Sequence, residues 1–193
     1  MYAKWLLDRT LSALGLLVAA PVMLVVAVLI RITMPNGPVL FRQERVGLKG
    51  RLFTIYKFRT MTVGHGGPMI SVAGESRITP LGAKLRRYKL DELPQLWNVL
   101  KGDMSFVGPR PDVPSEIDKL TDEQKALLLS IRPGITGPAS LKYAHEERIL
   151  QSQEKPLQYY DEVVFPDKVR INLDYVAHRS FWKNIAFMVK TIV

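Results

Sequence analysis

The chain has 193 residues, a length that suits one domain with a real hydrophobic core. It has no cysteine, which excludes a disulfide framework and a thiol nucleophile, and its three histidines (His65, His145 and His178) show no metal-ligand spacing. The formal net charge of +9 predicts an anionic partner such as anionic lipid or a phosphorylated substrate. Because the chain carries no zinc-finger, bZIP or RRM signature, we expect no nucleic-acid partner.

The first predicted element is an uncharged, apolar run over residues 11–30. As a straight helix it would be about 30 Å long, enough to cross the hydrocarbon layer of a membrane. Pro21 lies at its midpoint, where it removes a backbone hydrogen bond and favours a kink. Cations stand on both sides of the run, whereas a spanning helix usually has them on one side. They are Lys4 and Arg9 before it, and Arg31, Arg42 and Arg45 after it.

We therefore predict that residues 1–35 form a proline-broken, re-entrant membrane helix that enters one leaflet and returns, with Pro21 at its deepest point. Membrane lipids are then direct partners. A kinked spanning helix is the main alternative. An uncleaved signal peptide fits less well, because the apolar run is longer than a typical signal core and no small-residue cleavage site follows it.

Residues 36–193 are predicted to form one small α+β unit, mostly helical, that carries the chemistry. Apolar runs over 39–42 and 52–58, separated by Gly47 and Gly50, predict two extended segments, and a short β-hairpin is the expected arrangement. Residues 63–80 are rich in Gly, Ser and Pro, and a surface loop is expected there.

Several segments in the rest of the chain have the apolar spacing of helices. Apolar spacing predicts helices over 80–88 and 93–100, and Gly102 is a suitable stop for the second. Thr121 and Gln124 make a capping box. The apolar stripe of the C-terminal segment fits a core-packing helix and a helix lying flat on a membrane equally well. Residues 131–140 are expected to be turns, and the remaining predicted helices are 121–130, 143–153 and 180–193.

Two adjacent carboxylates, Asp91 and Glu92, are the strongest candidates for chemistry. They lie between a cationic cluster that includes Arg86 and a further cation, Arg110, held between two prolines. Carboxylates framed by cations suit phosphate chemistry, since cations neutralise the substrate and a carboxylate can bind a metal or attack phosphorus. The alternative is an ordinary helix start with solvated charges. Pro94 requires that the following helix begin a residue or two earlier, with both carboxylates near its N-terminus.

Four motifs occur in a fixed order along the chain. A proline-broken apolar helix (Ala20-Pro21) is followed by FRQERVG with KFRTM, by LDELPQLWNVLKGDMSFVGPRP, and by RPGITG. Over nearly its whole length the chain thereby resembles the bacterial sugar transferases, the monotopic phosphoglycosyl transferases. The chain begins almost at the re-entrant helix, so it looks like the minimal form of this family.

The resemblance implies an enzyme of the bacterial inner membrane that acts on the cytoplasmic face. Such enzymes take a UDP-sugar donor, move the sugar 1-phosphate onto a polyprenol (undecaprenyl) phosphate acceptor and release UMP, the first membrane step of a glycoconjugate pathway. It implies Mg²⁺ as cofactor and Asp91 as nucleophile and magnesium ligand. Glu92 would assist, either as a second metal contact or by accepting a proton from the lipid phosphate.

Within this scheme we expect Lys57, Arg59 and Arg110 to bind the substrate's phosphates. Arg86 is a further candidate, which would bind phosphate, pair with Asp91 or Glu92, or face solvent. The oligomeric state is open, and a homodimer is one possible assembly. Two rival functions are a membrane-anchored basic binding or scaffold protein and a metal-dependent nucleotide-sugar pyrophosphatase.

The helix break is Ala20-Pro21 where the family often has Ser-Pro, and the chain departs from the family pattern in three further places. After RPGITG, the family's AQVNGR is replaced by a different sequence over residues 138–148, which lacks the family arginine; Lys142 or Arg148 could replace that cation. Asn172 and Asn184 stand where relatives carry aspartate. We expect these departures to affect sugar or nucleotide specificity, not the core reaction.

Overall fold

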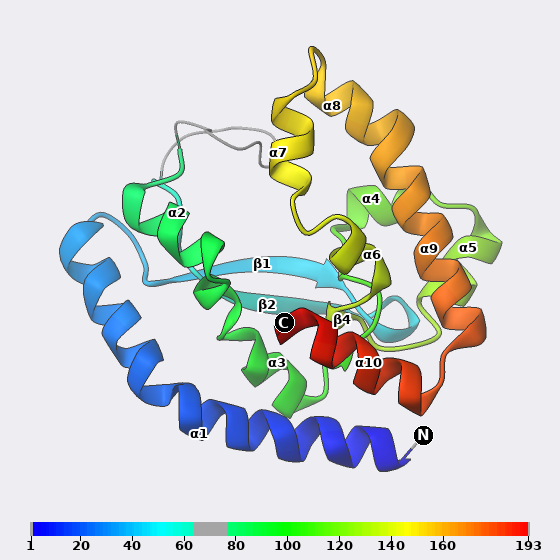
Figure 1. The fold of residues 1–193 in the computed structure, drawn as a ribbon, viewed down its shortest axis with the longest axis horizontal. Coiled ribbons are helices and arrows are strands. Elements are labelled where there is room, and N and C mark those ends of the chain that lie inside the picture. Colours follow the sequence, from blue (N-terminus) through cyan, green and yellow to red (C-terminus); the bar gives the residue numbers. More distant parts are fainter. Residues whose placement is uncertain (1, 64–76, 193) are drawn as a thin grey trace. The chain divides into compact units, whose positions relative to one another are not determined.

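The computed structural model describes residues 2–63 and 77–192 and is mostly helical (Figure 1). Its strands are β1 (Leu40–Val46), β2 (Leu52–Phe58), β3 (Ser105–Val107) and β4 (Gly134–Thr136). Its α-helices are α1 (Tyr2–Thr33), α2 (Pro80–Arg87), α3 (Gln95–Lys101), α4 (Pro114–Asp118), α5 (Asp122–Leu128), α6 (Pro138–Lys142), α7 (Glu146–Gln151), α8 (Pro156–Tyr159), α9 (Phe165–His178) and α10 (Phe181–Ile192). Short helical turns are η1 (Leu48–Gly50), η2 (Leu90–Glu92) and η3 (Tyr160–Val164).

These elements fall into two compact units. The first comprises Met1–Gln43 and Thr54–Gly102, and the second comprises Glu44–Phe53 and Asp103–Val193. The mostly helical α+β class with a long N-terminal apolar helix is confirmed. That residues 36–193 act as one unit stays a prediction.

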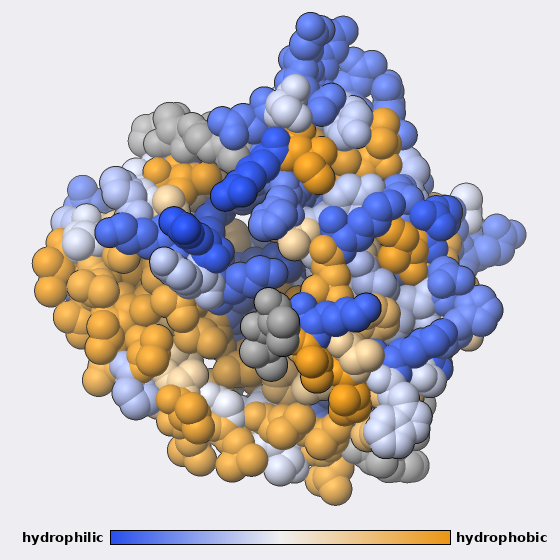
Figure 2. All heavy atoms as spheres, in the orientation of Figure 1, coloured by the Kyte–Doolittle hydropathy of each residue, from blue (hydrophilic) through white to orange (hydrophobic). Residues whose placement is uncertain are grey.

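Helix α1 is continuous over 32 residues with Pro21 inside it, so the predicted break takes the form of a bend, visible in Figure 1. One proline removes only one intrahelical hydrogen bond, and the helix resumes after it. The stretch Lys4–Thr33 is long and apolar enough to cross a membrane, and only 11% of its most apolar window is buried within the protein. Figure 2 shows the hydrophobic side chains gathered along this helix.

Both halves of α1 pack on the first unit. In the first half, Arg9 Nη2 donates to the carbonyl of Lys101 at 2.9 Å, and Gly15 faces Leu96 of α3. In the second half, a buried core joins α1 to β2 and α2; its buried members are Val26, Ile30, Met34, Phe58 and Leu85. The helix therefore lies along its unit instead of projecting from it.

The predicted hairpin is confirmed: β1 pairs with β2, although β1 runs four residues beyond the predicted end of the first strand. Helix α2 begins as predicted, with the Thr79 hydroxyl accepting from the Gly82 N–H. Of the loop expected over 63–80, residues 64–76 lie outside the described residues.

In the second unit, β3 and β4 pair in parallel, with Ser105 opposite Gly134 and Val107 opposite Thr136. The backbones approach so closely that a Cβ on Gly134 would lie 2.1 Å from Gly108 N. Residues 131–140, expected to be turns, instead hold a strand and the start of α6. The expectation of turns was wrong because Pro and Gly, which are typical of turns, here permit close backbone contact between two strands.

The helices of the second unit agree more closely with the predictions from the sequence. The Thr121–Gln124 capping box is present at the start of α5. The helix predicted over 143–153 is shorter, as α7. In α10, Phe187 and Met188 pack on the buried cluster around Val107 and Val176, which confirms the core-packing expectation for that face. At its start Trp182 is 76% exposed, and contact of this end with a membrane stays a prediction.

Candidate functional site

Asp91 and Glu92 belong to the tight turn η2, between α2 and α3. They precede α3 instead of opening it, because Pro94 takes the N-cap position and the helix proper starts at Gln95. The residue before the turn, Lys89, has φ 54° and ψ 22°, a left-handed conformation that costs a side-chain-bearing residue about 1 kcal/mol. Asp91 is buried, with 8% of its surface exposed. A buried carboxylate thus follows, two residues later, a backbone position that is itself strained.

The Lys57 ammonium, on β2, lies 2.7 Å from Glu92 Oε1. Both side chains are largely buried, at 18% and 17% exposed, so water screens this ion pair less than a surface pair. Lys57, one of the phosphate ligands expected from the sequence, therefore contacts the carboxylate pair. Glu92 is consequently oriented by a cation, while Asp91 is the carboxylate beside it.

Asn98 on α3 fixes the geometry between the turn and β2. Its side chain accepts from the Tyr56 N–H at 3.2 Å and donates to the Thr54 carbonyl at 2.7 Å, and it is fully buried. These bonds hold α3 against the strand that carries Lys57. The sequence analysis missed Asn98; the signal was a polar residue within the apolar face of a predicted helix. Gln95, one turn earlier, is 1% exposed, and its Nε2 has no hydrogen-bond partner in the described part of the chain.

Arg59 occupies an interior position, with 4% of its surface exposed. Its two terminal nitrogens donate to the backbone carbonyls of Met34 and Asn36, just beyond the end of α1. These carbonyls lack helical partners, and a guanidinium fork suits two of them at once. A phosphate-binding role for Arg59 stays a prediction, and the geometry favours a structural role.

Arg86 lies on α2 and is half-buried. Its Nε donates to the Thr60 hydroxyl at 3.0 Å, which directs the side chain toward the end of the KFRTM segment. The first unit therefore contains four of the predicted site residues besides Asp91: Lys57, Arg59, Arg86 and Glu92.

Arg110 belongs to the second unit, where GPRP follows β3. The neighbouring Pro111 carbonyl accepts from Arg45 Nη1 at 3.0 Å. Burial raises the pKa of the Asp112 carboxyl, and the cations Lys168, Arg45 and Arg110 oppose that rise. Arg110 is thus part of a group of cations around one enclosed carboxylate.

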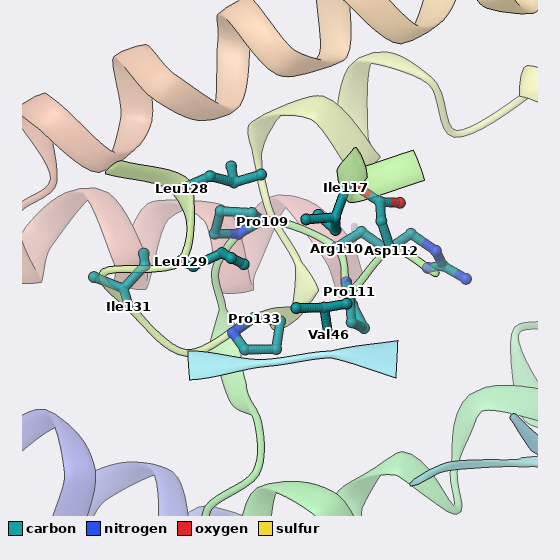
Figure 3. A pocket seen from close by; sticks show the side chains of 10 residues that line it. All are labelled: Val46, Pro109, Arg110, Pro111, Asp112, Ile117, Leu128, Leu129, Ile131 and Pro133. Atoms are coloured by element: carbon teal, nitrogen blue, oxygen red, sulfur yellow. The ribbon is translucent and has the colours of Figure 1, made fainter. Parts of the chain in front are cut away.

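A small pocket beside this group is lined mainly by apolar side chains (Figure 3). Arg110 and Asp112 lie at one end of the pocket, and Leu128 and Ile131 lie at the other. The cavity holds about 10 Å³, room for about one water molecule. It is a packing defect too small for a substrate.

The departures from the family pattern lie within the second unit. Asp167 accepts from Lys142 Nζ at 2.6 Å, from the Tyr143 hydroxyl at 2.7 Å and from Arg170 Nη2 at 2.7 Å. Lys142, one of the two candidates for the missing family cation, is therefore tied to Asp167. Arg148, the other, is exposed on α7. The divergent segment forms a polar network with α9.

The two asparagines that the resemblance places at family aspartate positions lie in the packed interior. The Tyr175 hydroxyl donates to Asn184 Oδ1 at 2.6 Å, and Asn184 is 6% exposed. Asn172 is 7% exposed, and its Oδ1 has no hydrogen-bond partner among the described residues. These positions support the fold around α9 and α10.

A magnesium ion would draw on few protein ligands here. Over residues 2–63 and 77–192, no group of three or more His, Asp or Glu side chains is placed to hold a metal ion. Mg²⁺, however, is commonly held by one or two carboxylates together with substrate phosphates and water. The adjacent Asp91 and Glu92 fit that donor set.

Comparison with known proteins identifies the relatives of this chain. The family model of the bacterial sugar transferases matches residues 1–193. A UDP-glucose:undecaprenyl-phosphate glucose-1-phosphate transferase of Xanthomonas campestris pv. campestris is 39% identical over 99% of this chain and 38% of its own length. A protein of the same name from Caulobacter vibrioides is 36% identical over 98% of this chain and 68% of its own length.

A third relative acts on a different sugar. The UDP-N-acetylgalactosamine-undecaprenyl-phosphate N-acetylgalactosaminephosphotransferase of Aeromonas hydrophila is 34% identical over 96% of this chain and 42% of its own length. The chain thus spans about two fifths of the Xanthomonas and Aeromonas proteins. The names of these relatives share the undecaprenyl phosphate acceptor and differ in the sugar.

Proposed function

The chain belongs to the bacterial sugar transferase family, and from this premise we propose that it transfers a sugar 1-phosphate from a UDP-sugar to undecaprenyl phosphate and releases UMP. The observation that carries the proposal is the buried Asp91 beside the Lys57–Glu92 ion pair. Relatives named for this reaction match the chain over nearly its whole length. The identity of the sugar is left open by their differing names.

The proposed reaction has two steps. An Asp91 carboxylate oxygen forms a bond to the phosphorus that carries the sugar, and the bond from that phosphorus to the UMP oxygen breaks. A phosphate oxygen of the lipid acceptor then attacks the same phosphorus and releases Asp91. An ionised carboxylate needs no proton removed before it attacks, so the first step requires positioning and charge neutralisation.

The residues around Asp91 have distinct parts in this scheme. Lys57 holds Glu92 in place and brings positive charge to the turn. Asp91 and Glu92 would hold Mg²⁺ together with the donor's phosphates, and the bound ion would neutralise charge that develops on the phosphate oxygens. Arg86 and Arg110 are the further cations proposed to contact the donor.

We also propose that α1 enters the cytoplasmic leaflet of the inner membrane and returns. Three observations support this topology: the bend of α1, the cations at both its ends, and the packing of both its halves on the same unit. A spanning helix would leave the unit at one end. Single cysteines at positions 2 and 36 should both react with an impermeant thiol reagent from the cytoplasmic side only, and labelling from opposite sides would mean a spanning helix.

The activity is tested with purified full-length protein, Mg²⁺, undecaprenyl phosphate and a panel of UDP-sugars. We expect UMP release together with a lipid-linked sugar product for at least one donor. UMP release that needs no lipid, with free sugar phosphate as product, would indicate a pyrophosphatase instead. Folded protein that releases no UMP from any donor would indicate a binding or scaffold protein.

A further inference from the structure

Asp91 shares one buried helical face with two amide side chains. The buried positions of this segment recur every three or four residues, which places them on one side of a helix; they are Asp91, Pro94, Gln95, Asn98 and Val99. The backbone stays helical between η2 and α3, because Leu93 and Pro94 both have right-handed helical angles. Asp91 and Gln95 are therefore neighbours, one turn apart on the same face.

The two amides on this face differ in their hydrogen bonds. The Asn98 side chain bonds to the backbone of β2, at Tyr56 and Thr54, and turns the face toward that strand (Figure 1). One turn earlier, Gln95 Nε2 is enclosed and has no hydrogen-bond partner in the described part of the chain. A buried donor without a partner lowers stability, and an apolar side chain of similar size would avoid that cost. Asn98 thus supports the fold, whereas the fold gives the Gln95 donor no partner.

The surroundings of Gln95 indicate its acceptor. Nε2 is shielded from solvent, so its partner is a group of the protein instead of water or a substrate. Asp91 is buried on the same face one turn earlier, at a spacing where Gln–Asp hydrogen bonds form on helices. A carboxylate has about four acceptor positions, so Asp91 can take a further donor beside its present contacts. Glu92, the other carboxylate of the turn, is directed to Lys57 at 2.7 Å.

We infer that Gln95 is a positioning residue for Asp91. With the UDP-sugar bound, Gln95 Nε2–H donates to the Asp91 carboxylate oxygen that does not attack phosphorus. The inference rests on the proposed function and deepens it at the same turn. The bond is not among the described contacts of Gln95, and it forms when Asp91 turns its other oxygen to the donor's phosphorus. Fixing one oxygen gives the other a single direction of approach.

A neutral donor suits both steps of the reaction. In the first step an amide orients the carboxylate without neutralising the charge that makes it nucleophilic, as a cation in the same place would. The attack joins one Asp91 oxygen to phosphorus and breaks the bond to the UMP oxygen, so the other oxygen becomes the carbonyl of an acyl phosphate and still accepts from Gln95. In the second step the electron pair of the broken phosphorus–oxygen bond returns to Asp91, and the N–H stabilises the charge that develops.

The first test is Gln95→Met, because methionine has a similar volume and no donor. We expect Q95M to lower kcat about 10- to 100-fold, as for the loss of one hydrogen bond to a charged group, with the KM for the UDP-sugar and for undecaprenyl phosphate within about twofold of wild type. Its melting temperature in nanodiscs should be unchanged or higher, because an unpaired buried donor is gone. A wild-type kcat in Q95M would overturn the inference.

Asn98→Leu is the matched comparison, since Asn98 is the amide of the same face with bonds to β2. N98L should lower the melting temperature and kcat together, because the Tyr56 N–H and the Thr54 carbonyl each lose a partner. The same joint loss in Q95M would assign Gln95 a structural role and overturn the inference.

The second test measures the two half-reactions separately. Protein is mixed with the UDP-sugar without acceptor, and undecaprenyl phosphate is added later, while intact-protein mass spectrometry follows the gain and then the loss of one sugar phosphate. Q95M should slow both the gain and the loss about tenfold or more. Wild-type rates for both in Q95M would overturn the inference.

These measurements separate the role of Gln95 from the reaction itself. If wild-type protein neither gained a sugar phosphate nor transferred it, the proposed function would fail and the inference with it. If wild type did both and Q95M matched its rates, only the inference would fail.

Discussion

Lys57 Nζ lies 2.7 Å from Glu92 Oε1 although 35 residues separate the two in sequence. The ion pair joins the KFRTM segment of β2 to the turn that carries Asp91. Its two side chains are similarly buried, so removal of either one costs the other an ion-pair contact that water screens little. The pair should therefore act as a unit in catalysis.

The first prediction concerns that unit. Lys57→Met and Glu92→Gln should each lower kcat by about 10²- to 10⁴-fold, and the double variant should be no worse than the more severe single variant. Steady-state UMP release with saturating acceptor, compared among the wild type, the two single variants and the double variant, measures this double-mutant cycle. Lys155→Met, an exposed cation, is the control and should keep wild-type rates. Losses that multiply in the double variant would mean that Lys57 and Glu92 act independently.

The second prediction concerns covalent chemistry at Asp91. Wild-type protein incubated with the UDP-sugar in the absence of acceptor should gain the mass of one sugar phosphate, seen by intact-protein mass spectrometry. Asp91→Asn should show no adduct and a loss of turnover of about 10⁴-fold or more, because an amide is not a nucleophile here. Asp118→Asn is the control, an exposed carboxylate of the second unit. An adduct that persists in D91N would place the nucleophile at another residue.

Local sequence patterns predicted local structure well. The capping box of Thr121, the hairpin strand β2 and helix α2 depend on residues within a few positions of one another, and the structure confirms them. The β3–β4 pairing was missed because two three-residue strands far apart in sequence carry too few residues for a strand pattern. Parallel pairing of this kind depends on tertiary contacts.

The candidate site shows the same division. Asp91 and Glu92 could be recognised from the motif, but the residues that hold them in position could not. The Lys57–Glu92 contact and the bonds of Asn98 to β2 are set by packing of α3 on the strand. The cationic motif predicts Arg59 as a phosphate ligand, and only the fold shows that its guanidinium also contacts two backbone carbonyls.

The third prediction follows from Arg59. Arg59→Met should lower the free energy of unfolding by about 1.5–3 kcal/mol, because two backbone carbonyls at the end of α1 lose a charged donor. Arg59→Lys should recover part of this loss, since one ammonium cannot serve both carbonyls with the geometry of a guanidinium. Thermal unfolding in nanodiscs measures the change. The control, Arg42→Met, removes a cation that lies over the Tyr56 ring.

The donor KM distinguishes the two roles of Arg59. If R59M leaves stability unchanged and raises the KM for the UDP-sugar about tenfold, Arg59 binds phosphate as its motif suggested. We expect that R59M lowers the stability and leaves the KM for the UDP-sugar unchanged.

The fourth prediction concerns the contact of RPGITG with GPRP. Gly134→Ala should lower the free energy of unfolding by about 3 kcal/mol, because its Cβ would lie 2.1 Å from Gly108 N and rigid backbone cannot yield. Gly50→Ala serves for comparison: it meets no atom within 4 Å, and its φ of 75° should cost about 1 kcal/mol. Chemical unfolding followed by tryptophan fluorescence measures both. Equal losses would show that the β3–β4 contact is looser than described.

The fifth prediction concerns the Asp167 network. Hydrogen bonds from Lys142, Arg170 and Tyr143 hold the pKa of the Asp167 carboxyl well below its usual value of 3.8. A carboxyl with a depressed folded pKa contributes stability that is complete above its unfolded pKa and is lost as pH falls below it. Asp167→Asn should therefore lower the melting temperature at neutral pH, and the difference from wild type should shrink as pH falls below about 3.8.

Tyr143 provides an independent readout of the same network. Burial, with the hydrogen bond to Asp167 as a further cause, raises the pKa of Tyr143 to about 12. In D167N an ultraviolet titration should show one tyrosine ionising at lower pH than in wild type, because the anionic acceptor of its hydroxyl is gone. Asp118→Asn should leave both the melting difference and the titration unchanged. A D167N protein whose tyrosines titrate as in wild type would show that Asp167 does not hold the Tyr143 hydroxyl in solution.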